Sequence, residues 1–152
     1  MPKLEIRYIR PEELKERDRN PRTHSKKQID QIVRSIEQFG FTNPLLVDSE
    51  KRLIAGHGRL AAARLLKIET VPTVCLADMS PDHVRAYVIA DNKIAENAGW
   101  DRELLAIEFK YLAELDIDFD LSVTGFDTPE IDIIFGEHDQ LSASQANAEA
   151  PE

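Results

Sequence analysis

The clearest pattern of apolar and polar positions in the chain predicts a helix between Ser25 and Gly40. Apolar side chains recur there at the three- and four-residue spacing of one helix face, namely at Ile29, Ile32, Val33, Ile36 and Phe39. Ser25 and Gln28 match a capping box, in which each side chain accepts a hydrogen bond from the backbone amide of the other. Gly40 is suited to the left-handed conformation that ends a helix.

Short apolar segments around this helix predict the strands of a small sheet. Residues 3–9 alternate apolar and charged side chains, a pattern typical of a half-buried strand. Residues 44–47 and 53–55 are apolar runs separated by a polar turn, and they predict a hairpin. Residues 71–76 predict a further strand, and Pro72 indicates either a sheet edge or a strand start.

Helical patterns dominate the rest of the chain. Residues 59–66 are rich in alanine and leucine, which favour helix. Residues 80–97 open with a serine-proline pair typical of a helix start. Residues 100–115 carry a stripe of leucines at helical spacing. A last short helix is expected over residues 128–135, closed by Gly136.

The patterning divides the chain into three segments. Residues 1–97 contain the mixture of strands and helices expected of a globular domain. Residues 98–136 are expected to form a helical extension packed on that domain. Residues 137–152 contain almost no large apolar side chain, so we expect a flexible tail or a linker there.

Composition and charge narrow the class of partner. The 152 residues are 42% hydrophobic and 31% charged, which is typical of one globular domain with appendages. No run approaches the roughly 18 consecutive apolar residues of a membrane span, so we expect no membrane partner. The charged N-terminus and the single cysteine favour a cytoplasmic location. The net charge of −9 argues against strong unaided binding to bulk DNA, although residues 7–34 hold most of a basic cluster.

The turn between residues 53–55 and the following helix carries the most specific chemistry. Gly56 and Gly58 can adopt positive φ and let an anion approach the backbone, where the free amides of a helix start converge. Arg59 offers a forked donor that suits two phosphate oxygens. His57 can donate a hydrogen bond, act as an acid or base near neutral pH, or ligate a metal. A purely structural tight turn is the alternative interpretation.

A second candidate cluster lies on the helix over residues 80–97. On a helical wheel Asp91 falls in the middle of an apolar face, with Asn92 at its edge; the apolar members are Val84, Tyr87, Val88 and Ala95. A carboxylate there is either a satisfied core group or a site residue. If both side chains face the glycine-rich turn, they can orient a magnesium ion, a ribose hydroxyl or an attacking water.

Several motifs resemble, in order and spacing, the N-terminal domain of ParB, the chromosome and plasmid partition protein. They are Asn20-Pro21-Arg22, Phe39-Gly40-Phe41-Thr42-Asn43-Pro44, Gly56-His57-Gly58-Arg59 and Val71-Pro72-Thr73-Val74. The resemblance covers roughly residues 4–97. It implies the α+β fold of the ParB/sulfiredoxin-like superfamily, a small mixed sheet flanked by helices, here with a C-terminal helical extension.

The resemblance also implies a ligand. In the ParB family the corresponding turn usually reads Gly-Glu-Arg-Arg and contacts a nucleoside triphosphate, commonly CTP. It implies that the turn Gly56-His57-Gly58-Arg59, together with Arg22, holds the phosphates of CTP or ATP. The family's Glu-Asn pair corresponds to Asp91 and Asn92, which are therefore the expected Mg²⁺ ligands. His57 and Asp91 are the candidate catalytic residues.

Two features depart from the ParB pattern. His57 and Gly58 replace the motif's glutamate and first arginine, and the turn is more similar to that of sulfiredoxin, whose reactive cysteine stands where this chain has His57. Sulfiredoxin chemistry is therefore not expected, whereas ATP-type phosphate binding is. No helix-turn-helix DNA reader is apparent after the domain, so DNA contact is expected only through an associated domain. Nucleotide hydrolysis is expected to be slow or absent.

A longer pattern, including residues 90–101 and 124–127, resembles the ParB-like domain that precedes DNA methyltransferase domains in phage and prophage modification enzymes. The methylase would then lie beyond Glu152, with the polar tail as linker. We expect a nucleotide-binding module that acts in DNA modification or partitioning, and dimerisation on ligand binding, as in ParB, is left open. Two alternatives remain: a non-catalytic domain that targets a methyltransferase to DNA, and a small-molecule kinase of the same fold, such as the ADP-dependent serine kinase.

Overall fold

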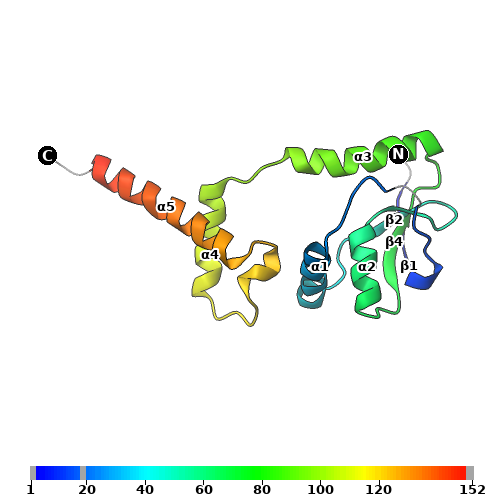
Figure 1. The fold of residues 1–152 in the computed structure, drawn as a ribbon, viewed down its shortest axis with the longest axis horizontal. Coiled ribbons are helices and arrows are strands. Elements are labelled where there is room, and N and C mark those ends of the chain that lie inside the picture. Colours follow the sequence, from blue (N-terminus) through cyan, green and yellow to red (C-terminus); the bar gives the residue numbers. More distant parts are fainter. Residues whose placement is uncertain (1–2, 18–19, 150–152) are drawn as a thin grey trace. The chain divides into compact units, whose positions relative to one another are not determined.

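The computed structural model describes residues 3–17 and 20–149, and the chain divides into two compact units, Met1–Ala98 and Gly99–Glu152. The first unit contains, in chain order, β1 (Ile6–Ile9), a 3₁₀ turn η1 (Pro11–Glu13), α1 (Lys26–Phe39), β2 (Leu45–Val47), β3 (Leu53–Ala55), α2 (His57–Leu65), β4 (Val71–Cys75) and α3 (Pro81–Asn97) (Figure 1). The second contains α4 (Arg102–Glu114), a 3₁₀ turn η2 (Leu121–Thr124) and α5 (Thr128–Glu149). None of the described helices has the length and apolar character needed to cross a membrane.

The strands form one mixed sheet in the order β1-β4-β2-β3. β1 pairs with β4 and β2 pairs with β3 in antiparallel fashion, whereas β2 and β4 run parallel. The predicted α+β fold with a small mixed sheet is therefore confirmed. Pro72 lies near the start of β4, which is an interior strand, so of the two interpretations the strand start is the correct one.

Helices cover both faces of this sheet, and neighbouring side chains of β3 pack against helices on opposite faces. Leu53 belongs to a buried cluster on the face of α2, together with Leu14, Leu45, Val47, Leu60, Ala63 and Val71. Its neighbour Ile54 points to the opposite face and packs against Val84 and Val88 of α3. The end of β3 consequently lies between α2 on one side and α3 on the other.

Helix α1 begins and ends at the residues that the sequence predicts, with one difference at each end. The Ser25 hydroxyl accepts a hydrogen bond from the Gln28 amide at 3.1 Å. The Gln28 side chain does not complete the capping box, because its oxygen lies 2.8 Å from Nδ1 of His24. Gly40 ends the helix through a bond from its amide to the Ile36 carbonyl, but its φ of 85° and ψ of 174° differ from the left-handed helical conformation expected there.

The prediction of a half-buried first strand is wrong. Its apolar positions Leu4, Ile6 and Tyr8 are 61%, 58% and 68% exposed. These side chains are on the face of the sheet that α3 covers only in part, and β1 lies outside the covered part. The alternation in the sequence therefore identified the strand but did not show whether its apolar face is buried.

The prediction that the last helix ends at Gly136 is also wrong. α5 continues through this glycine to Glu149. Ion pairs tie the residues just beyond the glycine to α4: Arg102 binds Glu137 at 2.7 Å and Lys110 binds Asp139 at 2.6 Å. A glycine inside a helix costs only about 1 kcal/mol, and the packing of Ile134 and Phe135 with Ala106 and Phe109 of α4 just before it can offset that cost. Residues 150–152 of the predicted tail lie outside the described residues.

Candidate functional site

The predicted turn joins β3 to α2 in a left-handed conformation. Gly56 has φ 103° and ψ 27° and forms the N-cap of α2, which starts at His57. The first bond inside the helix runs from the Leu60 amide to the Gly56 carbonyl at 2.8 Å. The amides of residues 57–59 therefore precede the helical ladder and point out of its positive end.

Both glycines are required by their surroundings. A Cβ added to Gly56 would overlap the side chain of Leu45, which is fully buried. A Cβ added to Gly58 would lie 2.8 Å from Cδ1 of Ile32 and 3.2 Å from Nδ1 of His24. Helix α1 and the residue before its N-cap thus press directly against the turn, which fixes the position of its amides.

Arg59 brings a partly buried cation to this place. Its Nη2 donates to the Pro44 carbonyl at 3.1 Å, and its Nε is buried without a partner among the described residues. Burial lowers the pKa of the guanidinium, and the charge of Asp91 opposes that effect. An arginine in a protein stays protonated, so Arg59 is a desolvated cation with donor capacity to spare.

The surroundings of His57 favour the neutral form of its imidazole. Burial is the largest cause that lowers the pKa of its imidazole, and the nearby charges of His24 and Arg17 act in the same direction, against Glu16. Its Nε2 is buried without a hydrogen-bond partner within residues 3–17 and 20–149. A neutral imidazole offers one donor and one acceptor to a ligand.

The lowered pKa of His57 predicts a pH dependence of stability. In the unfolded chain His57 takes up a proton near pH 6.5, whereas the folded chain resists protonation until a lower pH. The unfolded state therefore binds more protons below about pH 6.5, and this histidine makes the free energy of unfolding fall as the pH drops through that window. Urea unfolding at several pH values should show a flatter acid limb for His57→Gln than for the wild type; parallel limbs would contradict the assignment.

Asp91 and Asn92 reach the turn from α3, but not in the way the helical wheel indicates. Asp91 is exposed, which corrects the expectation that it occupies the centre of a buried apolar face. The Tyr87 hydroxyl donates a hydrogen bond to Asp91 at 3.5 Å, and burial is the main cause that raises the pKa of Tyr87. The Asn92 amide nitrogen donates to the Val88 carbonyl at 2.7 Å, so its amide oxygen points away as an acceptor.

These residues fit a magnesium ion only in company with a ligand. No group of three or more histidine, cysteine, aspartate or glutamate side chains with metal-site geometry occurs in the described part of the chain. Mg²⁺ typically keeps several waters and takes one or two carboxylates together with phosphate oxygens. The Asp91 carboxylate and the Asn92 amide oxygen, beside an anion site, match this mode of Mg²⁺ coordination. They do not form a metal site made of protein ligands alone.

The structure brings every residue predicted for the site into one cavity of about 200 Å³. Those residues are Arg22, Gly56, His57, Gly58, Arg59, Asp91 and Asn92. His24 and Gln28 also line it, as do apolar residues of α1 and β3. The lining comes from three separate parts of the sequence, residues 20–32, 54–59 and 88–92, so only the fold can assemble it.

Arg22 already has an anionic partner in this arrangement. Its guanidinium makes a short ion pair with Glu96 in the last turn of α3, and this hydrogen bond is the largest cause that lowers the pKa of Glu96. The Arg22 amide donates to the Asn20 side chain at 3.1 Å, which holds the turn. Sequence reasoning missed Glu96 because it lies 74 positions from Arg22 and no spacing connects them.

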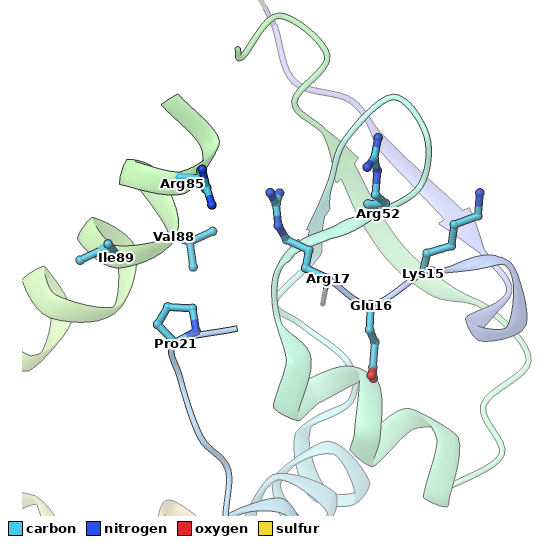
Figure 2. A pocket seen from close by; sticks show the side chains of 8 residues that line it. All are labelled: Lys15, Glu16, Arg17, Pro21, Arg52, Arg85, Val88 and Ile89. Atoms are coloured by element: carbon cyan, nitrogen blue, oxygen red, sulfur yellow. The ribbon is translucent and has the colours of Figure 1, made fainter. Parts of the chain in front are cut away.

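A second cavity of about 500 Å³ lies next to the first, and half of its lining residues are cations (Figure 2). Its charged lining residues are Lys15, Glu16, Arg17, Arg52 and Arg85. Figure 2 shows Arg85 of α3 facing Arg17 across the space. Val88 lines both cavities, and Pro21 of the second directly precedes Arg22 of the first. Lys15 and Arg17 belong to the basic cluster that the sequence shows in residues 7–34. Arg52 and Arg85 lie far from that cluster in the sequence, and only the fold brings them to the cavity.

Comparison with known families matches the chain in two parts. The model of the ParB N-terminal domain matches residues 1–92, and that of the ParB-methyltransferase HTH domain matches residues 103–152. The second match corrects the expectation that no helix-turn-helix domain follows. Sequence analysis missed this domain because it ended the last helix at residue 135 and assigned the following residues to a tail, whereas α5 continues to Glu149.

The chain is also similar to individual proteins. The ParB-like nuclease domain-containing protein YnaK of Escherichia coli K12 is 46% identical over 80 residues, which is 53% of this chain and 92% of YnaK. The C-terminally truncated ParB of Caulobacter crescentus, solved with CTP-gamma-S, has a TM-score of 0.63 at 24% identity, over 72% of this chain and 63% of that one. The same protein with its centromeric parS site has a TM-score of 0.49 at 18% identity, over 95% and 80%. This chain thus spans less than two thirds of the CTP-gamma-S-bound ParB, and the likeness at 24% identity establishes the fold.

Proposed function

The chain belongs to the ParB N-terminal domain family, and from this premise we propose that it binds a nucleoside triphosphate, CTP or ATP, with the phosphates in the 200 Å³ cavity. The observation that carries the proposal is the partly buried Arg59 guanidinium, with spare donor capacity, beside the free amides at the start of α2. Amides at a helix N-terminus and a guanidinium fork both favour phosphate oxygens.

The size of the cavity restricts which part of the ligand it holds. Pockets for small molecules usually measure about 300–1,000 Å³, and this cavity is smaller than that range. It suits the phosphates alone. The sugar and base then extend towards the neighbouring 500 Å³ cavity, where Arg17 and Arg85 are available.

Arg22 is proposed to exchange partners when the nucleotide binds. It is held by Glu96 on the rim of the cavity, where both side chains are substantially exposed. An exposed ion pair is worth little in stability, so a phosphate can displace the carboxylate at small cost. Arg22 then contributes to the phosphate site from the side opposite Arg59.

A magnesium ion bound with the nucleotide would be held by Asp91 and Asn92 and would neutralise phosphate charge. Asp91→Asn is expected to reduce the Mg²⁺-dependent gain in triphosphate affinity by about 10-fold, since the variant loses a carboxylate that lines the cavity while keeping its shape. Titration calorimetry with and without Mg²⁺ measures this gain. Asp82→Asn, in the exposed first turn of α3, is the matched control and should leave the gain unchanged; an equal loss in both variants contradicts the assignment.

Turnover is proposed to be slow or absent. His57 and Asp91 are the candidate groups for activating water, and a neutral His57 can accept a proton. Asp91, however, is open to solvent, and a site that water enters stabilises transition-state charge weakly. Phosphate release assayed with each nucleotide tests this directly.

The proposed setting is a DNA transaction in the cytoplasm, such as DNA modification or partitioning. The match to a ParB-methyltransferase HTH domain supports it. Residues 99–152 contain 14 acidic and only two basic side chains, so phosphate neutralisation by this unit is weak and DNA contact would rely on an associated domain or on the basic first unit.

Calorimetry with CTP, ATP and ADP in the presence of Mg²⁺ tests the proposal as a whole. Saturable binding of a triphosphate, competed by the other nucleotides, is the expected result. Absence of heat with all three would instead favour the non-catalytic targeting domain. Transfer of phosphate to a hydroxyl acceptor in a substrate screen would favour the small-molecule kinase.

A further inference from the structure

Strand β1 forms one edge of the sheet and presents apolar side chains to solvent. β4 lies on one side of it, and no strand among the described residues lies on the other (Figure 1). Ile6 and Tyr8 are 58% and 68% exposed, and Leu4, just before the strand, is 61% exposed. An exposed apolar edge strand is a template for pairing with another chain.

The pairing with β4 determines which backbone groups of β1 point outwards. Residues of an antiparallel pair alternate between positions bonded to the partner strand and positions whose groups face away. Tyr8 lies opposite Pro72, which has no amide hydrogen, so that position is not a bonded one. The Arg7 carbonyl faces β4, where it accepts a bond of 2.8 Å from the Thr73 hydroxyl. The amides and carbonyls of Ile6 and Tyr8 therefore face the open edge.

The segment Leu4-Glu5-Ile6-Arg7-Tyr8 is complementary to itself when two copies run antiparallel. With Ile6 opposite Ile6 of the second copy, the outward-facing positions exchange backbone bonds. Glu5 of each copy then lies opposite Arg7 of the other, and Leu4 lies opposite Tyr8. Directly opposed unlike charges and apolar pairs both stabilise an antiparallel ladder.

Neighbouring registers lack this complementarity. A register centred on Glu5 opposes two carboxylates, and one centred on Arg7 opposes two guanidinium groups, which is destabilising in both cases. A register centred between two residues opposes an outward-facing position with one that faces β4, so the ladder cannot form. Backbone geometry thus leaves the registers centred on a residue, and charge selects the one centred on Ile6 among them.

We propose that two copies of this chain associate through β1, antiparallel and with Ile6 on the twofold axis, so that one sheet continues through both copies. The strand contributes few residues, so the dimer is weak and forms reversibly as the concentration rises. The exposed face of Leu4, Ile6 and Tyr8 becomes a row of cross-strand pairs. The association does not depend on nucleotide binding.

Sedimentation velocity of the 152-residue chain over a wide concentration range tests the proposal by exchanging charges. Arg7→Glu and Glu5→Arg are each expected to raise the dimer dissociation constant at least about 10-fold, because both symmetry-related pairs become repulsive. The double variant Glu5→Arg/Arg7→Glu should restore dimerisation, and circular dichroism verifies that each variant folds. Arg34→Glu, an exposed charge reversal on α1, is the control that should leave dimerisation intact.

Cross-linking tests the register. In a Cys75→Ser background, Ile6→Cys should form a disulfide dimer, because opposed residues of a bonded pair lie about 5.5 Å apart at Cα, within disulfide range. Tyr8→Cys should not, since the two copies of that residue are about 13 Å apart along the strands in this register. A chain that stays monomeric, a dimer insensitive to the charge reversals, or equal cross-linking at both positions, as in non-specific aggregation, overturns the proposal.

Discussion

Replacing Arg59 with alanine is expected to weaken nucleoside triphosphate binding by about 10- to 100-fold. A hydrogen bond to a charged group is worth about 1.5–3 kcal/mol, and about 1.4 kcal/mol corresponds to a factor of ten. Arg59 is the cation held deepest in the cavity, anchored by its bond to the Pro44 carbonyl. The measurement is titration calorimetry with CTP and with ATP in Mg²⁺.

Two further variants show whether the effect comes from the charge of Arg59, from its forked donor, or from the loss of any arginine. Arg59→Lys keeps the charge but loses the forked donor, so its affinity should fall between those of the wild type and the alanine variant. Arg34→Ala removes an exposed arginine that lines neither cavity, and its affinity should match the wild type. If Arg59→Ala folds and binds triphosphate as tightly as the wild type, the phosphate site lies elsewhere.

Replacing Gly56 with alanine is expected to destabilise the first unit by about 2–5 kcal/mol. A left-handed conformation costs a residue with a Cβ about 1–2 kcal/mol, and overpacking adds about 1–3 kcal/mol. Both apply, since Gly56 has a φ of 103° and its Cβ would overlap Leu45. Domains are typically stable by only about 5–15 kcal/mol, so the loss is large. Urea unfolding followed by circular dichroism measures it.

Gly125→Ala is the matched control for this substitution. Gly125 has φ 96° and ψ −15°, the same left-handed region as Gly56, but an added Cβ would meet nothing within 4 Å. Its substitution therefore carries the backbone cost without the overlap, and it should destabilise the second unit less than Gly56→Ala destabilises the first. Equal losses would mean that Leu45 moves aside freely and that the turn is not held by the sheet.

The local features of the site could be predicted because each rests on neighbouring residues. A strand followed by Gly56-His57-Gly58-Arg59 and an alanine-rich segment predicts amides converging at a helix start, whatever the rest of the chain does. The serine-proline start of α3 is equally local, and its Ser80 hydroxyl accepts a bond from the His83 amide. The family resemblance rests on the same short motifs and is confirmed.

Features that depend on distant neighbours could not be predicted in this way. The helical wheel put Asp91 on a buried face because it treats the helix alone, whereas only the part of α3 that packs on Ile54 is covered. The Gln28 side chain contacts His24 and does not complete the capping box, and Arg22 pairs with Glu96. Neither contact can be read from the spacing of residues in the sequence. α5 passed Gly136 because one glycine costs a helix little, and the residues just before it pack in a buried cluster with α4.

The sequence by itself determined the strands and helices of the first unit, its turn chemistry and its family, because those depend on backbone preferences and side chains a few positions apart. The tertiary structure alone decided which faces are buried, which cations surround the cavity and which edge of the sheet stays open. Burial and ion pairing are properties of the packed chain, since water is excluded only where separate elements meet. That is why Arg59 became a desolvated cation in a cavity while β1 kept its apolar side chains in solvent.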